Sequence, residues 1–305
     1  MSERPSLREL GLSTTTVATN FLRGLAQRRV RSAIGLRGDP PPPCLDPATA
    51  YAPVDGMMRV VHGDLGAMLI GGVASLLYQL LHPLAMAGVD QHSRYRESPL
   101  RRLENTALFI GTTTYGSAAD AYLLIERVKA MHCGVVGTAP DGTTYQASDP
   151  HLLEWVHCCE VAMFLAGFER YGSLSLTDAQ RDAYVAEMSR VGHDLGAVNL
   201  PLTVADLHQR LEGFLPELRL TAAGRETRRF VLRGVGGSPV QRSAYRTIVA
   251  AAIGLLPTTI RDLLELPALP LVDGALVAPA AYALSETMRL ALPPIPSASG
   301  PHQSR

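Results

Sequence analysis

His132 is the side chain in this sequence that is best placed to do chemistry. It stands near the end of AADAYLLIERVKAMHC, residues 118–133, a segment with the character of a helix. Helical spacing predicts one face that carries Ala118, Tyr122, Ile125, Lys129 and His132. An imidazole that projects from a helix into an apolar pocket can ligate iron, with Cys133 as the nearest alternative ligand. A histidine at a helix C-terminus also favours the helix dipole, so spacing alone leaves both roles open.

Arg102 and Thr106 form a second candidate group, with Asn105 between them. They are four residues apart in a predicted helix and therefore share a face. An arginine there can pair with a carboxylate, and a threonine can donate a hydrogen bond to a bound oxygen species. The alternative is an exposed arginine and a threonine that bonds its own helix.

Four other histidines carry weaker signals. His82 precedes Pro83 at a predicted helix end, and His92 stands at the edge of a loop. His151 and His157 are six residues apart, so they point to different sides of their helix and cannot hold one metal ion together. We expect all four to be structural.

The standard catalytic motifs are missing from the sequence. It contains no GxSxG elbow, no HExxH and no phosphate-binding P-loop. The glycine-rich turn at residues 234–237 does not follow a predicted strand, so we do not expect it to bind a nucleotide.

Composition indicates a globular protein with a large core. The 305 residues are 47% hydrophobic and only 18% charged, with a net charge of zero. Without a positive field, nucleic acid is not an expected partner. The four cysteines lack zinc-site spacing, and the N-terminus lacks an apolar signal segment, so we expect a reduced, cytoplasmic protein.

Residues 66–89 are almost uncharged and long enough to suggest a membrane span. Pro83 breaks this stretch, and polar and glycine residues interrupt it. We therefore expect a buried helix and no stable membrane span.

The expected fold class is all-α, in three parts. Residues 1–56 should form an N-terminal helical arm and a Pro-rich connection, GDPPPPCLDP. Residues 57–293 should form the helical domain, and residues 294–305 a disordered tail. One short β-hairpin is expected near residues 137–145, where Pro-Asp-Gly separates β-favouring residues.

Capping residues predict where the helices begin and end. The expected helices start at Ser98–Pro99, Ser117, Asp149–Pro150, Thr177 (with Gln180 as a capping box) and Thr203, and the one at Ser117 should end with Gly134 as a left-handed C-cap. Residues 240–266 should be helical with a break at Pro257, and a last helix should cover residues 279–292.

Several segments, in this order, resemble a known family. They are HPLAMAGVDQHSRY, RRLENT, ERVKAMHCGVVG, TTYQASDPHLLEWVH and LLPTTIRDLLELP, and they extend from His82 to Pro267. This series is similar to the latex-clearing (rubber) oxygenases and the MpaB-type oxygenases, in a bacterial branch of unassigned substrate.

The resemblance implies a multi-helix, globin-like core that binds haem b. It implies that His132 is the iron ligand and that Arg102 and Thr106, with Asn105, line the pocket as catalytic residues. Many relatives carry basic residues just after the ligand histidine, where this sequence has CGVV. Arg127 and Lys129, one turn earlier, are therefore the candidate partners of the haem propionates.

The expected function is that of a haem b-dependent oxygenase. It would act with dioxygen on a small apolar substrate, such as an isoprenoid or another lipid-like molecule. The alternative is a catalytically inactive helical protein of the same fold that binds a small molecule or a partner. The sequence leaves the oligomeric state open, and a homo-oligomer is compatible with it.

Overall fold

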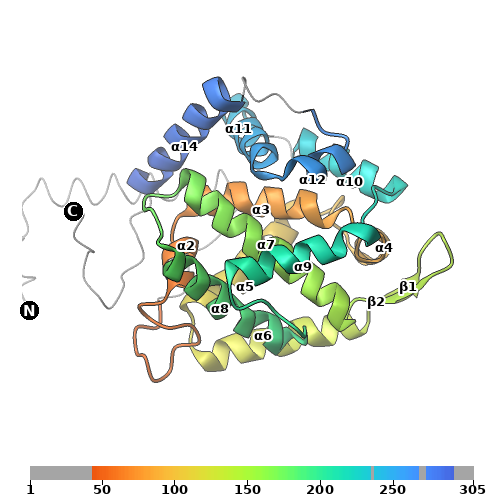
Figure 1. Cartoon of the computed structure of the whole chain (residues 1–305), viewed down its shortest axis with the longest axis horizontal. Coiled ribbons are helices and arrows are strands. Elements are labelled where there is room, and N and C mark those ends of the chain that lie inside the picture. Colours follow the sequence, from red (N-terminus) through yellow and green to blue (C-terminus); the bar gives the residue numbers. More distant parts are fainter. Residues whose placement is uncertain (1–42, 235–236, 268–272, 292–305) are drawn as a thin grey trace, which may run out of the picture.

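The chain folds into α-helices joined by short connections, with one two-stranded hairpin (Figure 1). The computed structural model describes residues 43–234, 237–267 and 273–291. The elements are α2 (Met57–His62), α3 (Leu65–Gln79), α4 (Pro83–His92), α5 (Pro99–Tyr115), α6 (Ala118–Cys133), β1 (Val136–Thr138), β2 (Thr144–Gln146), α7 (Pro150–Tyr171), α8 (Asp178–Leu195), α9 (Val204–Phe214), η1 (Leu215–Glu217), α10 (Ala222–Arg233), α11 (Pro239–Leu255), α12 (Thr258–Leu263), η2 (Asp273–Val277) and α14 (Ala278–Ala291). The prediction of an all-α fold with one short hairpin is confirmed.

Helix α7 is the centre of the fold, and it crosses α3 in close contact. Its buried residues are spread around the whole helix and include Trp155, Phe164 and Phe168. A helix that is apolar on all sides must be enclosed by others. Gly71 of α3 permits the contact, since a Cβ atom there would lie 2.5 Å from the carbonyl oxygen of Met163.

Further helices cover this pair on two sides. Helices α10, α11, α12 and α14 form the upper layer in Figure 1, where α11 and α14 contact α3 and α10 contacts α4. Helices α6 and α8 lie on the opposite side and contact each other. The core of buried hydrophobic residues is continuous through these layers.

The capping predictions are confirmed at four helices and wrong in two details. The side chains of Ser117, Asp149, Thr177 and Thr203 each accept a hydrogen bond from a backbone N–H in the first turn of α6, α7, α8 and α9. Helix α5 does begin at Pro99, but the Ser98 hydroxyl makes no capping bond. Gly134 ends α6 with a φ of −82°, so it is not the left-handed cap that was expected.

The other predicted elements agree with the structure. Strand β1 pairs antiparallel with β2, and Gly142 takes a φ of +88° in the Pro-Asp-Gly turn between them. Helix α11 ends before Pro257 and α12 follows it, as the predicted break requires. The four cysteines, Cys44, Cys133, Cys158 and Cys159, are all free thiols.

The described part of the segment before α2 is joined to the helical domain. Tyr51, Ala52 and Val54 are buried, and the Cys44 N–H donates to the Tyr115 carbonyl oxygen. Residues 1–42 and 292–305, on which the predicted arm and tail mainly depend, lie outside the described ranges, as do residues 235–236 of the glycine-rich turn.

Residues 66–89, predicted as one buried helix, fall in two helices, of which α3 is mostly buried and α4 buries Pro83, Met86, Ala87 and Gly88. Within the described ranges no single helix is both long and apolar enough to cross a membrane, and α3 and α4 reach that length and composition only as a pair bent by 105°.

Candidate functional site

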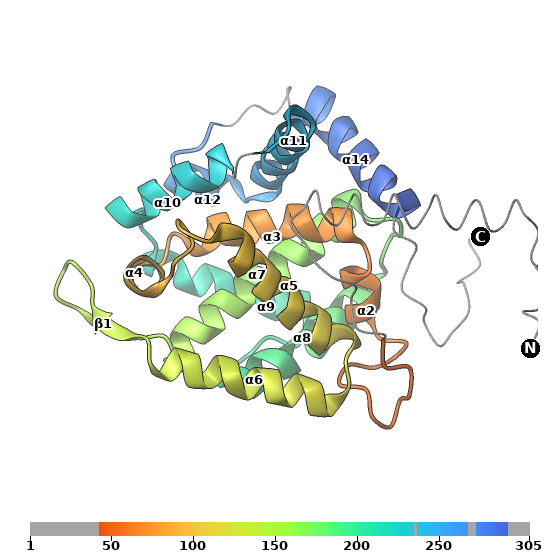
Figure 2. The ribbon, with the colours of Figure 1, turned by 180° about the vertical axis from the view of Figure 1, so that it is seen from behind.

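The first candidate site lies between α5 and α6, which form a helical hairpin. The chain turns from one to the other at Gly116 and Ser117, and the two ribbons move apart from this corner (Figure 2). Arg102 and Thr106 are near the start of α5, and His132 is near the end of α6. Because the hairpin is antiparallel, all three predicted residues lie toward its open end.

A buried polar cluster fixes the closed end of this hairpin. The Thr114 hydroxyl donates to the Ile110 carbonyl oxygen (2.6 Å) and lies 2.8 Å from Nδ1 of His62, whose Nε2 is 3.2 Å from the Tyr184 hydroxyl. Burial lowers the pKa of His62 to about 3, so its ring is neutral. The cluster thus joins α5 to α2 and α8.

The rest of α5 is little buried. Its only buried residues are Thr113 and Thr114, although it has 17 residues and includes large apolar side chains. Leu100, Leu103 and Leu108 are exposed on it. A helix this apolar normally buries one face against the protein. Its first three turns therefore leave apolar surface available to a bound molecule.

His132 presents a free imidazole nitrogen on α6. The side chain is half-buried, and its Nδ1 atom is buried with no hydrogen-bond partner among the described residues. Burial also lowers the pKa of His132. A neutral imidazole has one nitrogen lone pair, so this residue suits metal ligation.

The Arg102 side chain is exposed near the start of α5. Its guanidinium donates to the Ser93 hydroxyl, and burial lowers the pKa of Arg102 while the nearby Tyr95 raises it. Asn105 and Thr106 are exposed on the same helix, and neither makes a side-chain hydrogen bond to another described residue.

The two predicted propionate partners are placed differently. Arg127 is exposed and lies about 140° around α6 from His132, since each helical residue turns the chain by about 100°. Lys129 lies about 60° from His132 by the same rule. Its ammonium group is 2.8 Å from the Glu126 carboxylate, which raises the pKa of Lys129.

Sequence reasoning missed Glu160, a partly buried carboxyl group on α7. Burial raises the pKa of Glu160 to about 7, so it is half-protonated near neutral pH. A signal was present, since Glu154 and Glu160 are the only acidic residues in an otherwise apolar stretch of residues 152–168.

A second group was also missed. His82, His151 and Glu217 come together although they are far apart in the sequence. The prediction considered only pairs of histidines on one helix, and these three residues come from three segments.

Residues 59–289 match the family described as "ER-bound oxygenase mpaB/B'/Rubber oxygenase, catalytic domain". Two relatives, the uncharacterized proteins Mb2261 of Mycobacterium bovis and Rv2237 of Mycobacterium tuberculosis, are each 31% identical over 128 residues. These residues are 40% of this chain and 49% of each relative, so the match spans about half the length of the curated relatives.

No solved structure matches the chain. The matched region runs from α2 to α14 and includes both α5 and α6. Because it covers well over half of the sequence, the chain belongs to the family of mpaB and rubber oxygenase catalytic domains.

Proposed function

We propose that this protein is a haem b-dependent oxygenase that acts with dioxygen on an apolar substrate. Membership of an oxygenase family supports the reaction class. The single observation that carries the cofactor assignment is the unpartnered, buried Nδ1 atom of His132 at the open end of the α5–α6 hairpin.

His132 fits the role of iron ligand. Its ring is neutral because burial disfavours the charged form, and metal ligation needs the neutral ring. Haem, when bound there, would supply an iron centre able to activate dioxygen. Helix α6 would hold the imidazole in place, since Ile125 and Ala121 on its inner face are buried in the core.

The side chains of α5 would complete the pocket from the other side. Arg102 would pair with a carboxylate or polarise dioxygen. Thr106 and Asn105, on the same helix, would donate hydrogen bonds to dioxygen. Lys129 is the better placed of the two candidate propionate partners, and it would exchange its pair with Glu126 for a propionate.

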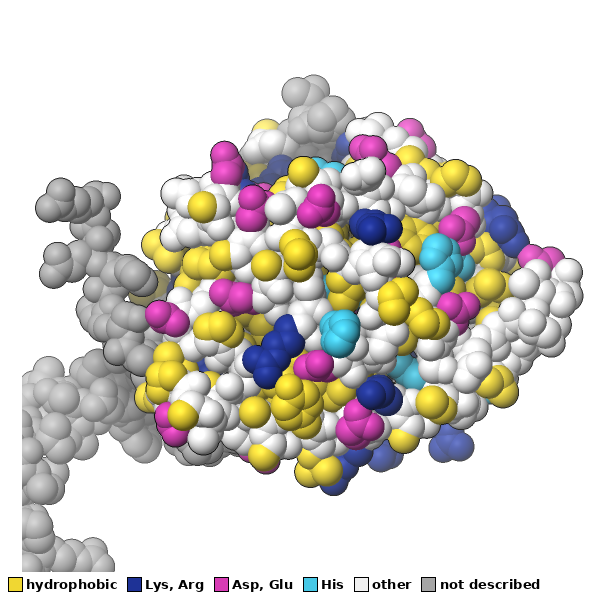
Figure 3. Space-filling model, turned by 60° about the horizontal axis from the view of Figure 1, so that its bottom comes forward, with side chains coloured by type: hydrophobic (Ala, Val, Ile, Leu, Met, Phe, Trp, Pro, Cys, Tyr) yellow, Lys and Arg dark blue, Asp and Glu magenta, His cyan; other side chains and the backbone are white. Residues whose placement is uncertain are grey.

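The substrate is proposed from the apolar surface that surrounds these residues. Leu100 and Leu103 of α5 and Met131 of α6 are large, apolar and exposed. Burying such surface against a ligand is favourable by roughly 25 cal/mol per Å². An isoprenoid or another lipid-like molecule would match this surface better than a charged metabolite. Figure 3 shows that charges of both signs are interspersed with hydrophobic side chains on one face of the molecule.

An absorbance spectrum of the purified protein, with haem supplied during expression, tests the cofactor. We expect a Soret band with about one haem per chain, and oxygen uptake when an apolar substrate is added. A protein that takes up no haem would instead support the alternative, a helical binding or interaction protein that has kept the fold.

A further inference from the structure

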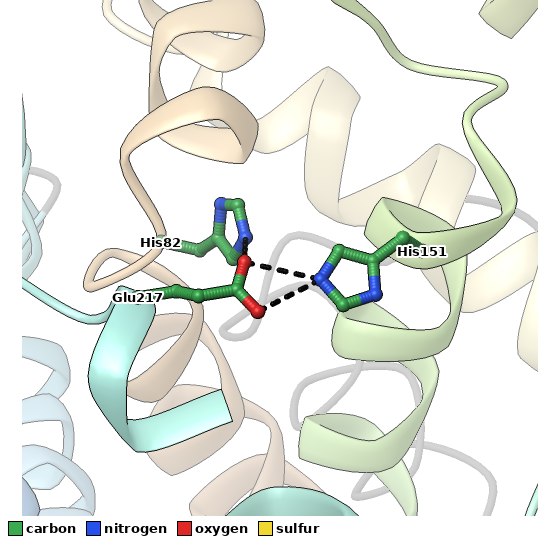
Figure 4. A group of neighbouring side chains, drawn as sticks. All are labelled: His82, His151 and Glu217. Carbon is green, nitrogen blue, oxygen red and sulfur yellow. Dashed lines mark hydrogen bonds and ion pairs between the residues drawn. The ribbon is translucent and has the colours of Figure 1, made fainter. Parts of the chain in front are cut away.

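Three side chains that could hold a metal ion meet near the β1–β2 hairpin. His82 is the residue before α4, His151 is in the first turn of α7, and Glu217 ends η1 (Figure 4). Nε2 of His82 is 3.2 Å from Oε2 of Glu217, and Nε2 of His151 is 3.0 Å from each Glu217 carboxylate oxygen. Each imidazole ring thus directs its Nε2 atom at the Glu217 carboxylate.

The surrounding fold holds these three residues in place. The Arg219 N–H donates to the Leu81 carbonyl oxygen (2.8 Å), which fixes the segment after η1 against the segment before α4. The His151 ring lies over Phe214 with centroids 4.7 Å apart, and the His82 ring packs against Trp155. The two imidazoles are therefore oriented by aromatic neighbours as well as by Glu217.

The donor set and its dimensions suit a transition-metal ion. One ligand atom from each residue lies within 4.8 Å of the others. Ligands at about 2.0–2.1 Å from a tetrahedral zinc ion are separated by about 3.3 Å. The nitrogen–oxygen distances here are close to that value, so small side-chain movements would admit an ion. Two histidines and one glutamate are a donor set of zinc sites that keep a fourth position open, and of iron(II) sites.

Burial and charge also suit an ion. His82 is only 2% exposed, whereas the side chains of His151 and Glu217 are 50% and 42% exposed, so an ion can enter from solvent. The nearby cation Arg219 is already paired with Asp141 at 2.7 Å.

We propose that His82, His151 and Glu217 form a binding site for a divalent transition-metal ion, with Zn²⁺ as the best match and a fourth position open to water. The site shares no residue with the proposed haem site. A bound ion would link the start of α4, the start of α7 and η1, which lie far apart in the sequence. Metal binding to the folded state alone would stabilise it.

The test uses the full chain, dialysed against a chelator and then equilibrated with Zn²⁺. We expect elemental analysis to find one zinc equivalent in wild type that is missing in His151→Gln and Glu217→Gln. We expect Zn²⁺ to raise the unfolding temperature of wild type and to leave that of both variants unchanged. His208→Gln, which replaces an exposed histidine of α9, is the matched control and should bind zinc as wild type does.

X-ray absorption at the zinc edge of wild type gives a readout that needs no variant. The proposal requires nitrogen and oxygen ligands with imidazole scattering. Sulfur ligands, equal zinc content in wild type and both variants, or no zinc retained by wild type would each overturn it. The haem spectrum of His151→Gln should equal that of wild type, so the outcome is independent of the haem assignment.

Discussion

Gly71 and Gly167 face each other where α3 crosses α7, and neither position has room for a side chain. A Cβ atom at Gly167 would lie 2.7 Å from the Ala67 carbonyl oxygen and 3.2 Å from the Gly71 Cα atom. Because the atoms in the way belong to backbone, they cannot move aside without separating the helices. The central helix pair therefore depends on these two glycines.

We expect Gly71→Ala and Gly167→Ala each to lower the free energy of unfolding by about 1–3 kcal/mol, the usual cost of overpacking a core. Chemical denaturation checks this. Gly213→Ala in α9 is the control, because a Cβ atom there meets nothing within 4 Å, and it should be neutral or slightly stabilising. Equal stabilities for all three variants would contradict the close contact.

His132→Ala should abolish haem binding or shift the Soret band, while far-ultraviolet circular dichroism stays unchanged. The half-buried side chain makes no hydrogen bond to a described residue, so the fold should tolerate its loss. Cys133→Ala replaces the exposed neighbour and should leave the spectrum as it is. Full haem with an unaltered spectrum in His132→Ala would exclude this residue as the ligand.

Arg102→Ala should lower haem content or activity, and Thr106→Ala should lower activity more than haem content. Both follow from the placement of these residues on α5 opposite the ligand helix. Arg101→Ala, at the exposed neighbouring arginine, is the matched control and should behave as wild type. Haem content from the absorbance spectrum and turnover from oxygen uptake separate the two effects. Wild-type values in both variants would remove these residues from the site.

Glu160 should make the protein less stable as pH rises. Burial raises the pKa of Glu160 from 4.5 to about 7, so the folded protein binds this proton more tightly than the unfolded chain does. Its contribution to stability is therefore fully present below pH 4.5 and decreases as pH rises to about 7. Above pH 7 the folded state carries a desolvated carboxylate.

Glu160→Gln cannot ionise, so it should remove this decrease. We expect the variant to exceed wild type in unfolding free energy above pH 7, by on the order of 1 kcal/mol. Denaturation curves at pH 5 and pH 8 check this, with the exposed Glu212→Gln as control. An equal decrease with pH in Glu160→Gln and wild type would show that another group titrates.

Local features of the fold could be predicted from the sequence. The capping box of Thr177 and Gln180 is made within one turn, so residue types at fixed spacing are enough to find it. Gly134 shows where such local prediction fails. A glycine at a helix C-terminus permits a left-handed conformation without requiring one, and here the chain leaves α6 toward β1 with a negative φ.

Contacts between distant segments could not be predicted. His82 and Glu217 are 135 residues apart, and their meeting depends on how α4, α7 and η1 pack. Helical spacing correctly predicted that His151 and His157 point to different sides of α7. It could not predict that His151 lies close to His82, because His82 belongs to another segment. Likewise, spacing placed His132 on one helix face with Ile125 and Lys129, whereas only the packed structure shows that Nδ1 lacks a partner among the described residues.

Helix α5 has a further consequence for how the molecule moves. Its last turn is held by Thr114, while its first three turns bury no side chain. Segments with so few buried contacts open locally at low free-energy cost, without global unfolding. The amides in those turns should therefore exchange with solvent long before those of α7. Local opening of these first turns would admit a bulky molecule while Thr114 keeps the last turn of α5 in place and the α3–α7 crossing stays intact.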